Sequence, residues 1–577
     1  MGNARKICVI TSTLMLVVLV ILDQFYDYHY LNSSLTSGFD ILAIRFKIVD
    51  HRAPAPLAQS SSDGSKKHPL CPGRTARTFP QFSYPSVHPI NWTNHMDITN
   101  HTTTTFELVN PKETYFICDE IELRVHARNG RNESKKYGGD LFRAKIFTKN
   151  STYSASSSSD GEIVDHGNGT YSAYFTFKWT GMVSISMSLI VPSEASYVLD
   201  RIRIEHQPRI AYFGGFVSSN KSEKEGFCNL QLRKPMNETE YCNFTDAATK
   251  SPWFCEKPAG FHCSEWKKHR IDGRRSEQQA FEVINQTERE AFKVSNKMLR
   301  GSVKSVRVIN VNSTRRPMIR IEDLPVCTLG YNSEQPEVAG FYEMDNWYPP
   351  ACQVHRFRNV AKMRKCFRNR QFFFFGDSTI RQLHEYYLDT LKLSKSFLGE
   401  EGSGYTGPVS GRDVRNSITT FFAFHKYPVG KQSWTYDKDL EYIATRINNL
   451  SSSGYPVVVV SVWAHFESAP PVIYEERVRG IVLAMGKLLD RNKRAVALFK
   501  SGNTRQVKSL GQYACCSDWY ARGTEERMRK IIFQDKRIGF IDAWDMTHAQ
   551  LLADDAHPKG SHVANMNDQL LTFLGCS

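Results

Sequence analysis

An uncharged apolar stretch near the amino terminus decides the compartment in which the rest of this chain folds. Residues 7–22 carry no charged side chain, Arg5 and Lys6 precede them, and Asp23 follows. Because flanking positive charge is retained on the cytoplasmic side, the chain beyond this stretch is directed into the secretory lumen. No small-residue cleavage site follows Leu22, which favours an uncleaved signal anchor over residues 1–22. We therefore expect a single-pass type II membrane protein, located in the Golgi, with cleavage and secretion as the alternative.

Cysteines and glycosylation sequons agree with a luminal location. Of 13 cysteines, Cys8 lies in the apolar stretch, and the remaining 12 form an even number compatible with disulfide bonds. The N-x-S/T sequons, which predict N-glycosylation, concentrate in the first half of the chain. They are Asn32, Asn91, Asn100, Asn132, Asn150, Asn168, Asn220, Asn237, Asn243, Asn285, Asn312 and Asn449. The amino-terminal half is thus predicted to present a glycosylated surface.

The charge of the chain points to an anionic partner. The net charge is +15 over 577 residues, a length that at roughly 150 residues per domain gives two to four domains. A luminal chain without a recognisable nucleic-acid module does not fit a nucleic-acid partner, which we exclude. An acidic glycan or glycoprotein is the anionic partner that the compartment offers.

Patterning divides the luminal part into four segments. Residues 23–105 are rich in Pro, Ser and Lys and predict a stem without a core. Residues 106–265 show two-residue alternation, as at Ile121, Leu123 and Val125, separated by turn-rich pieces, and predict an antiparallel β-sandwich of immunoglobulin type with a cysteine-rich end. Residues 266–349 are left as a bridging segment.

The cysteine-rich end contains Cys228, Cys242, Cys255 and Cys263. Their spacings do not match the close pairs of structural zinc sites, and the compartment is oxidising. We expect disulfide bonds there and no bound metal, with the pairing left open.

The carboxy-terminal segment, residues 350–577, changes to an α/β pattern. Short apolar runs at 371–375, 457–463, 495–499 and 539–544 alternate with amphipathic stretches such as Thr379 to Leu391. Such runs predict a mostly parallel sheet with helices on both faces, an α/β/α fold. Reactive groups of such sheets gather in the loops beyond the carboxyl ends of the strands.

Two motifs in those loops form a candidate catalytic set. Gly376-Asp377-Ser378 follows the first apolar run, where a serine at a strand-to-helix turn is exposed, although a helix N-cap serine is the simpler interpretation. Near the carboxy terminus, Asp554 precedes His557 by three residues, a spacing that lets the carboxylate orient the imidazole toward Ser378.

Other arrangements of these histidines remain open. Asp545 and His548 repeat the D-x-x-H spacing closer to the last strand, and we rank this pair second. A metal site within the cluster of His548, Asp554, Asp555, His557 and His562 is the lesser alternative, because the matched serine favours nucleophilic catalysis.

The strings FFFFGDSTIRQ, WAHF, KSGNTR, IDAWDMTHAQ and DDAHP, in this order, resemble the neurexophilin and PC-esterase domain family. The resemblance implies a neurexophilin-like β domain followed by a PC-esterase domain, a branch of the SGNH (GDSL-like) hydrolase fold. It also implies Ser378 as nucleophile and Asp554 and His557 as its partners. GDSTIRQ resembles in addition the corresponding motif of the Golgi sialic-acid O-acetyltransferase.

The oxyanion hole departs from the SGNH pattern, because the strand-end block reads Trp463-Ala464-His465 without an asparagine. His465 and Asn503 are the candidate donors, and Gly402, Gly404 and Gly407 compete for the glycine position. Gly376, Asp377 and Arg381 complete the predicted oxyanion and substrate-binding set. Basic residues accumulate just before the nucleophile, either to attract an acidic glycan or as a solvated surface. These are Arg356, Arg358, Lys362, Arg364, Lys365, Arg368 and Arg370.

These observations predict serine-dependent O-acyl transfer on sialylated or other acidic cell-surface glycans, by an O-acetyltransferase or O-acetylesterase. No bound cofactor is expected, and acetyl-CoA is a candidate acyl donor. The alternative is a catalytically inactive glycoprotein ligand that binds a cell-surface receptor through its neurexophilin-like domain.

Overall fold

A computed structural model describes residues 69–70 and 92–577, except 158–162, 206–208, 233–236, 238, 302–304, 311–318, 331–339, 350–351, 400–404 and 559. The predicted anchor over residues 1–22 and most of the predicted stem lie outside this part of the chain. Within it, no helix is both long enough and apolar enough to cross a membrane. The short strands β1 (Pro69–Leu70) and β18 (Ile319–Arg320) pair with each other.

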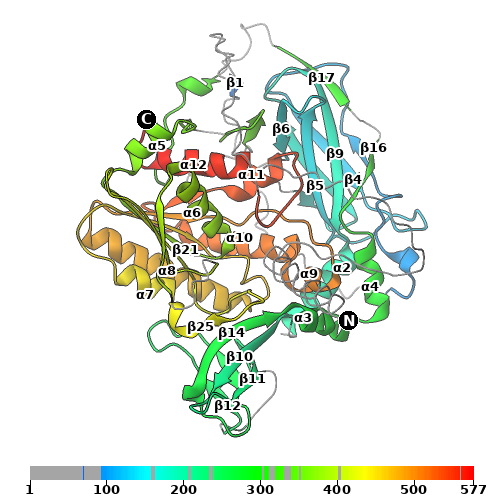
Figure 1. Cartoon of the computed structure of the whole chain (residues 1–577). Helices are drawn as coiled ribbons and strands as arrows, with labels where there is room; N and C mark the ends of the chain where they lie inside the picture. Colours follow the sequence, from blue (N-terminus) through cyan, green and yellow to red (C-terminus); the bar gives the residue numbers. More distant parts are fainter. Residues whose placement is uncertain are drawn as a thin grey trace, which may run out of the picture. The chain divides into compact units, whose positions relative to one another are not determined.

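Two β-sheets in the amino-terminal half share one core (Figure 1). One runs in the order β16 (Arg300–Gly301), β2 (Thr105–Leu108), β4 (Glu120–His126), β8 (Thr170–Thr176), β7 (Val164–Asp165). The other runs β20 (Asn346–Tyr348), β19 (Phe341–Glu343), β6 (Tyr153–Ser156), β5 (Leu141–Thr148), β9 (Gly181–Val191), β17 (Ser305–Ile309), β3 (Tyr115–Phe116), with β15 (Lys297–Met298) beside β9. Most of these strand pairs are antiparallel.

Two-residue alternation produces this core. Leu123 and Val125 of β4 and Ala144 and Ile146 of β5 are fully buried and belong to one apolar cluster. Because successive side chains of a strand point to opposite faces, one face of each sheet packs against the other sheet. The predicted bridging segment supplies β15 to β17 and β19 to β20 to these sheets.

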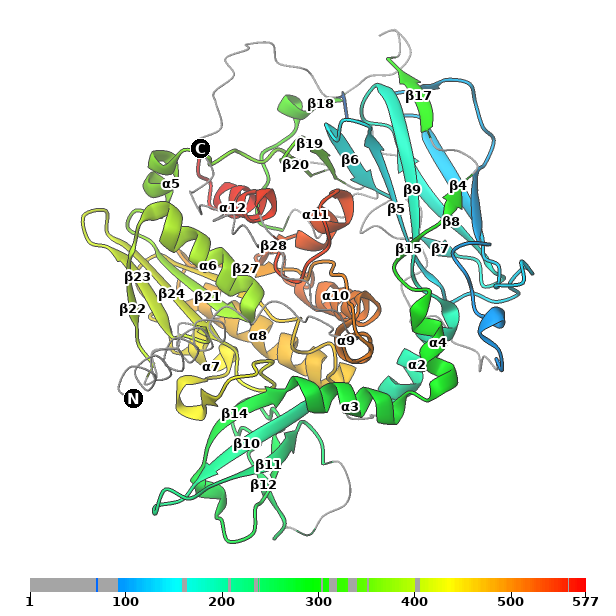
Figure 2. The same ribbon diagram turned by 45° about the vertical axis from the view of Figure 1, so that its right-hand side comes forward.

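A third sheet holds the cysteine-rich segment. Its order is β12 (Tyr241–Asn243), β13 (Phe254–Glu256), β11 (Glu223–Asn229), β10 (Ala211–Val217), β14 (Trp266–Asp272), β25 (Thr435–Tyr436). Disulfide bonds join Cys228 to Cys255 and Cys242 to Cys263, so the predicted oxidised state is confirmed. The helices α2 (Ser193–Ile204), α3 (Gly273–Val283) and α4 (Gln286–Lys293) lie between this sheet and the first two (Figure 2).

The carboxy-terminal sheet runs β22 (Ser394–Phe397), β23 (Val409–Asp413), β24 (Ile418–Phe424), β21 (Gln371–Gly376), β26 (Pro456–Ser461), β27 (Val496–Lys500), β28 (Gly539–Ile541). The pairs from β24 to β28 are parallel, and β22 and β23 form an antiparallel edge. The four predicted apolar runs are the strands β21, β26, β27 and β28, whereas β24 and the edge strands were not predicted.

Helices accompany both faces of this sheet. They are α5 (Val360–Phe367), α6 (Ser378–Leu391), α7 (Ile443–Asn448), α8 (Pro471–Arg491), α9 (Leu510–Cys516), α10 (Asp518–Ile532), α11 (Ala543–Ala549) and α12 (Ser561–Phe573). On β21, the rings of Phe372 and Phe374 contact Phe367 and Tyr387 of α5 and α6, and Phe375 points to the opposite face and is also buried. The chain is thus multidomain, with mixed sheets and helices.

Candidate active site

Ser378 lies where strand β21 turns into helix α6. Gly376 ends the strand with φ of +148°, and a Cβ at this position would lie 1.8 Å from the carbonyl oxygen of Ser461. Only glycine allows this backbone conformation and this approach to β26. Ser378 is the first residue of α6, so its backbone N–H belongs to the helix-terminal amides that have no acceptor within the helix.

Asp377 fixes the turn before the nucleophile. Its Oδ1 accepts hydrogen bonds from the backbone N and Oγ1 of Thr379 at 2.9 and 2.7 Å. Its Oδ2 accepts from the backbone N of Trp463 and of Ala464, each at 3.1 Å. Burial raises the pKa of Asp377, but nearby His465 and Lys500 outweigh it and hold the pKa below its usual range. The carboxylate therefore joins the β21 and β26 loops, whereas substrate binding by Asp377 stays a prediction.

The structure brings His557, the histidine ranked first, to Ser378. The two atoms His557 Nε2 and Ser378 Oγ are 2.6 Å apart. His557 lies in the segment between α11 and α12, residues 550–558, which we call the active-site loop. Within this loop the backbone N–H of His557 donates to Asp555 Oδ1 at 3.0 Å.

The rival pair occupies a different place. His548 lies on helix α11, where its ring packs against Trp544. The Asp545 carboxylate accepts hydrogen bonds from Ser156 Oγ at 3.3 Å and from the backbone N of Gly340 at 3.1 Å. Ser156 ends strand β6 and Gly340 directly precedes strand β19, which pairs with β6, so Asp545 contacts the sheet that holds these two strands.

The Asp554 carboxylate bonds in two directions. Its Oδ1 accepts from Thr504 Oγ1 at 2.7 Å, and its Oδ2 accepts from the guanidinium of Arg143 on strand β5. Burial raises the pKa of Asp554, but Arg143 and Lys145 outweigh it and keep the pKa below the usual value. Asp554 is therefore ionised at neutral pH.

His557 is held neutral by its surroundings. Burial lowers its pKa to about 4, and the positive charge of Arg381 acts in the same direction, against Asp377 and Asp555. A neutral imidazole 2.6 Å from a serine hydroxyl can accept the hydroxyl proton.

His465 belongs to a chain of hydrogen bonds that defines its tautomer. His425 Nδ1 donates to the carbonyl of Lys426 at 2.6 Å, which leaves His425 Nε2 to accept from His465 Nδ1 at 2.8 Å. Burial lowers the pKa of His425 to about 3 and of His465 to about 4, so both rings are neutral at neutral pH. In this tautomer His465 Nε2 is an acceptor, and the predicted donor role of His465 would require a second proton.

The remaining predicted oxyanion residues have other contacts. Asn503 Nδ2 donates to the carbonyls of Asp555 and Ala556 in the active-site loop, at 2.9 and 3.2 Å. Arg381 packs its guanidinium 3.8 Å from the ring centroid of Tyr405 and donates to the Tyr405 carbonyl. The glycine candidates Gly402 and Gly404 lie outside the described residues, and Gly407 lies beside Phe422.

Two charged residues of the site, Arg505 and Lys500, were not predicted from the sequence. Arg505 acts electrostatically on both His557 and His465, and its guanidinium bonds to Glu467. Lys500 is buried and donates to Thr379 Oγ1 at 3.3 Å, and burial lowers its pKa to about 8. Both lie in the KSGNTR string, as its first and last residues, and the sequence alone predicts no role for either.

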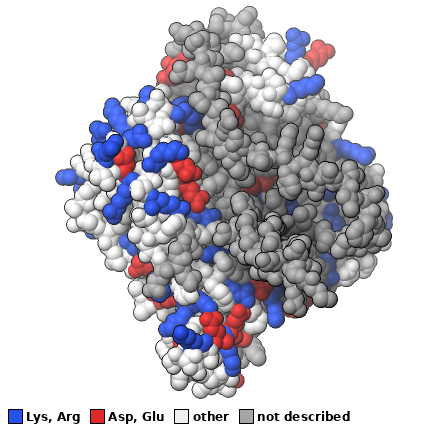
Figure 3. All heavy atoms as spheres, in the orientation of Figure 1, with Lys and Arg blue, Asp and Glu red and all other residues white. Residues whose placement is uncertain are grey.

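The basic residues that precede Ser378 gather at the other end of strand β21. Arg356 and Arg358 pair with Asp568 of α12, and Arg364 pairs with Asp413. Figure 3 shows lysine and arginine side chains on the left of that view, over the part of the molecule where Figure 1 draws α5 and α6. Because α5 enters the amino end of β21 and Ser378 follows its carboxyl end, this basic set lies at the far end of the strand from Ser378. Arg381, predicted with the substrate-binding residues, does act on His557.

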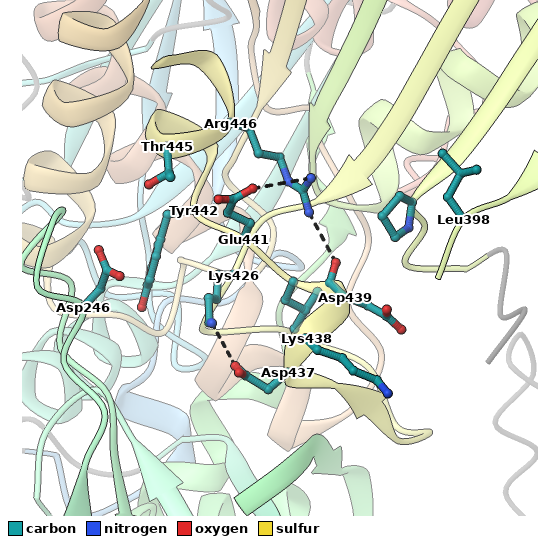
Figure 4. Close-up of a pocket in the computed structure, with 12 residues that line it drawn as sticks. Asp246, Leu398, Lys426, Asp437, Lys438, Asp439, Glu441, Tyr442, Thr445 and Arg446 are labelled. Atoms are coloured by element: carbon teal, nitrogen blue, oxygen red, sulfur yellow. Dashed lines mark hydrogen bonds and ion pairs between the residues drawn. The ribbon is translucent and has the colours of Figure 1, made fainter. Parts of the chain in front are cut away.

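A polar cavity lies away from the Ser378–His557 pair. Its volume is about 530 Å³, and its lining includes Asp246, Lys426, Asp437, Tyr442 and Arg446 (Figure 4). Lys426 pairs with Asp437 at 2.9 Å across it. Mixed charges of this kind indicate no particular ligand.

The predicted glycosylation sites that the structure describes are accessible. Asn132, Asn150, Asn168, Asn220, Asn237, Asn243, Asn285 and Asn449 are exposed, and Asn100 is half-buried. Asn32, Asn91 and Asn312 lie outside the described residues.

Each half of the chain matches a known protein family. Residues 91–287 match the family described as neurexophilin, and residues 347–576 match the one described as NXPE family member 4-like, C-terminal domain. Among solved structures, the bacterial integrin-binding protein invasin aligns at 9% identity with a TM-score of 0.12, over 55% of this chain and 57% of that chain. The chain thus spans a little over half the length of invasin.

Proposed function

Because this chain is a member of the NXPE family, with both a neurexophilin and an NXPE carboxy-terminal region, we propose that it transfers acyl groups to glycans by way of Ser378. The observation that carries the proposal is the 2.6 Å contact of a neutral imidazole with a serine hydroxyl at a strand-to-helix turn. We assign the carboxy-terminal half to an SGNH-like, PC-esterase fold and the amino-terminal half to an immunoglobulin-like one.

The proposed reaction has two acyl transfers. Ser378 Oγ attacks the acyl carbonyl while His557 Nε2 takes its proton, and the donor's alcohol or thiol leaves with that proton. The backbone N–H of Ser378 faces the developing oxyanion as part of the α6 terminus. A sugar hydroxyl then gives its proton to His557 and attacks the Ser378 ester. Ser378 Oγ leaves and takes that proton from His557, and the acyl group stays on the sugar. Water in place of the sugar gives an esterase.

Asp554 and Asp555 divide the supporting role in this proposal. Asp554 anchors the active-site loop through Thr504 and Arg143, and Asp555 bonds to the backbone of His557. Asp555, together with Asp377, stabilises the imidazolium that forms when Ser378 loses its proton.

An acidic glycan is the proposed acceptor and an acetyl thioester such as acetyl-CoA the proposed donor. Arg381 and Arg505 place positive charge around His557, which favours a sialylated acceptor. The disulfide bonds are consistent with the secretory pathway. We propose a Golgi location with the predicted amino-terminal anchor.

The test compares the full chain with Ser378→Ala, His557→Ala and His548→Ala in cells. We expect the first two variants to lose O-acetyl groups on cell-surface sialoglycans and to lose hydrolysis of an acetyl ester by at least about 10³-fold. His548→Ala is the matched control, because its ring lies on α11 against Trp544, and we expect it to retain activity.

Equal behaviour of wild type and Ser378→Ala in both assays would overturn the proposal and leave the receptor-binding glycoprotein as the interpretation. Activity that survives loss of His557 but not of His548 would assign the base to the rival pair.

A further inference from the structure

The active-site loop is held from two sides. From the carboxy-terminal half, Asn503 in the loop after β27 donates to the carbonyls of Asp555 and Ala556, and Gln382 on α6 donates to the carbonyl of Pro558 at 2.6 Å. From the amino-terminal half, two basic side chains of strand β5 contact the same loop. Arg143 bonds to Asp554, and Lys145 Nζ donates to the carbonyl of Gln550.

The sequence of β5 explains why these cations reach the loop. Phe142, Ala144 and Ile146 point into the core between the two sheets, so Arg143 and Lys145 point to the opposite face. On an uncovered sheet that face would be in water, but only 8% of Arg143 is exposed. Figures 1 and 2 both draw α11 beside β5 and β6, where the carboxy-terminal half covers this face.

Arg143 joins two loops of the site. One guanidinium nitrogen bonds to Asp554 and the other to Asp518, the first residue of α10. Asp518 Oδ1 in turn accepts from the backbone N of Arg505 at 2.9 Å. The planar guanidinium, with donors at fixed angles, therefore sets the separation of the loop that carries His557 from the loop that carries Arg505.

Where the amino-terminal and carboxy-terminal halves meet, basic side chains of one half face acidic side chains of the other. The amino-terminal half contributes Arg143, Lys145 and Lys178, and the carboxy-terminal half contributes Asp518, Asp545 and Asp554. Loss of one partner of such a buried set leaves a carboxylate without compensation, which displaces the loop that holds it.

We propose that Arg143 is a positioning residue for the reaction: through Asp554 it holds His557 at Ser378, so that the catalytic unit includes the neurexophilin-like half of the chain. This inference rests on the proposed acyl transfer. Because displacement of a reacting group by about 1 Å costs on the order of 100-fold in rate, an effect of this size is expected from its loss.

A double-mutant cycle tests the coupling in the full chain. Arg143→Gln, Asp554→Asn and the double variant are compared by kcat/KM for an acetyl ester and by the rate at which a fluorophosphonate labels Ser378. We expect each single variant to fall about 10- to 100-fold, and the double variant to fall no further than the worse single one. Effects that multiply would overturn the proposal, because a merely structural arginine would act independently of Asp554.

The matched control is Arg201→Gln. Arg201 also pairs with two carboxylates, those of Glu205 and Glu288, but lies on α2 away from the loop, and we expect unchanged labelling and kcat/KM. If Arg143→Gln does not fold, Arg143→Lys decides, because lysine keeps the charge but cannot span both carboxylates. Wild-type rates in a folded Arg143→Lys protein would overturn the proposal.

Hydrogen exchange of residues 550–558 separates failure of this inference from failure of the proposed function. Faster exchange in the Arg143 variant, together with slower Ser378 labelling, is the expected result. Unchanged exchange and labelling while Ser378→Ala abolishes activity would overturn the role of Arg143 alone. Activity that does not depend on Ser378 would overturn both.

Discussion

At the scale of single residues, the charge state of His557 decides whether the site can act. Burial and Arg381 lower its pKa from 6.5 to about 4. A base must be neutral, so kcat/KM for ester hydrolysis is expected to rise through pH 4 and to be level by pH 6, where an ordinary histidine would still be mostly protonated. A pH–rate profile of the wild type measures this acidic limb directly.

The lowered pKa of His557 also makes the folding stability of the protein depend on pH. Because the folded pKa lies below the unfolded one, the unfolded chain binds the extra proton between pH 6.5 and 4. The contribution of His557 is therefore complete above pH 6.5 and declines as the pH falls toward 4.

Arg381→Gln should move the acidic limb to higher pH, because it removes a positive charge that lowers the pKa of His557. Arg479→Gln is the control, since Arg479 is exposed on α8 and pairs with Glu475. A limb that stays in place in Arg381→Gln would contradict the assignment of His557 as the group that titrates.

At the scale of elements, the turn from β21 to α6 depends on one glycine. In Gly376→Ala the new Cβ would overlap the Ser461 carbonyl, at 1.8 Å, in a backbone conformation that is confined to glycine. We expect a loss of at least about 3 kcal/mol in stability, and a fall in kcat of about 100-fold as Ser378 shifts. Thermal unfolding and ester hydrolysis measure the two effects.

Gly480→Ala is the matched control. Gly480 lies within helix α8 and a Cβ there meets nothing within 4 Å, so alanine should stabilise the helix by about 0.5–1 kcal/mol. Equal effects of the two substitutions would show that the turn does not need glycine.

The pattern of apolar residues along the sequence predicted several of the strands correctly. The alternation at Ile121, Leu123 and Val125 is strand β4, and the apolar run at 371–375 is β21. Strand β24, with the sequence ITTFFAF, was not predicted. It lies inside the sheet, between β23 and β21, but its two threonines interrupt the apolar run that an interior strand is expected to show.

The sequence predicted those residues of the site that lie in motifs after the ends of strands. Ser378 and His557 were named from motifs, and the structure places them in contact. The partner of Asp554 could not be named, because Arg143 is 411 positions away and its alternating strand looks solvated in sequence. The tautomer of His465 likewise depends on His425, which no motif singled out.

At the scale of the whole molecule, contacts between distant parts of the chain define the unit that folds. Besides the ion pairs of Arg143, strand β25 of the carboxy-terminal half extends the cysteine-rich sheet next to β14. Tyr520 of α10 donates to the carbonyl of Leu199 on α2 at 2.8 Å. The described residues from 92 onward therefore stabilise one another across domain borders.

The disulfide between Cys366 and Cys576 closes the longest loop among the disulfides in the part of the chain described, with a separation of 210 residues. It ties α5 to the segment after α12, the helix that follows the active-site loop. Since a cross-link restricts the unfolded chain more as the loop grows, its loss is expected to cost about 2–5 kcal/mol. For a domain of this size that corresponds to a fall of roughly 4–20 °C in melting temperature.

The experiment replaces both cysteines by serine and follows thermal unfolding together with Ser378 labelling. Cys515→Ser with Cys516→Ser is the control, because these neighbours close no loop of chain and their loss removes no such restriction. We expect a clear fall in melting temperature only in the Cys366/Cys576 pair, with labelling at 25 °C retained, since the cross-link lies at the amino end of β21 and Ser378 at its carboxyl end. Loss of labelling in the folded variant would instead show that the carboxy-terminal cross-link holds α12, and with it the active-site loop, in register with the nucleophile.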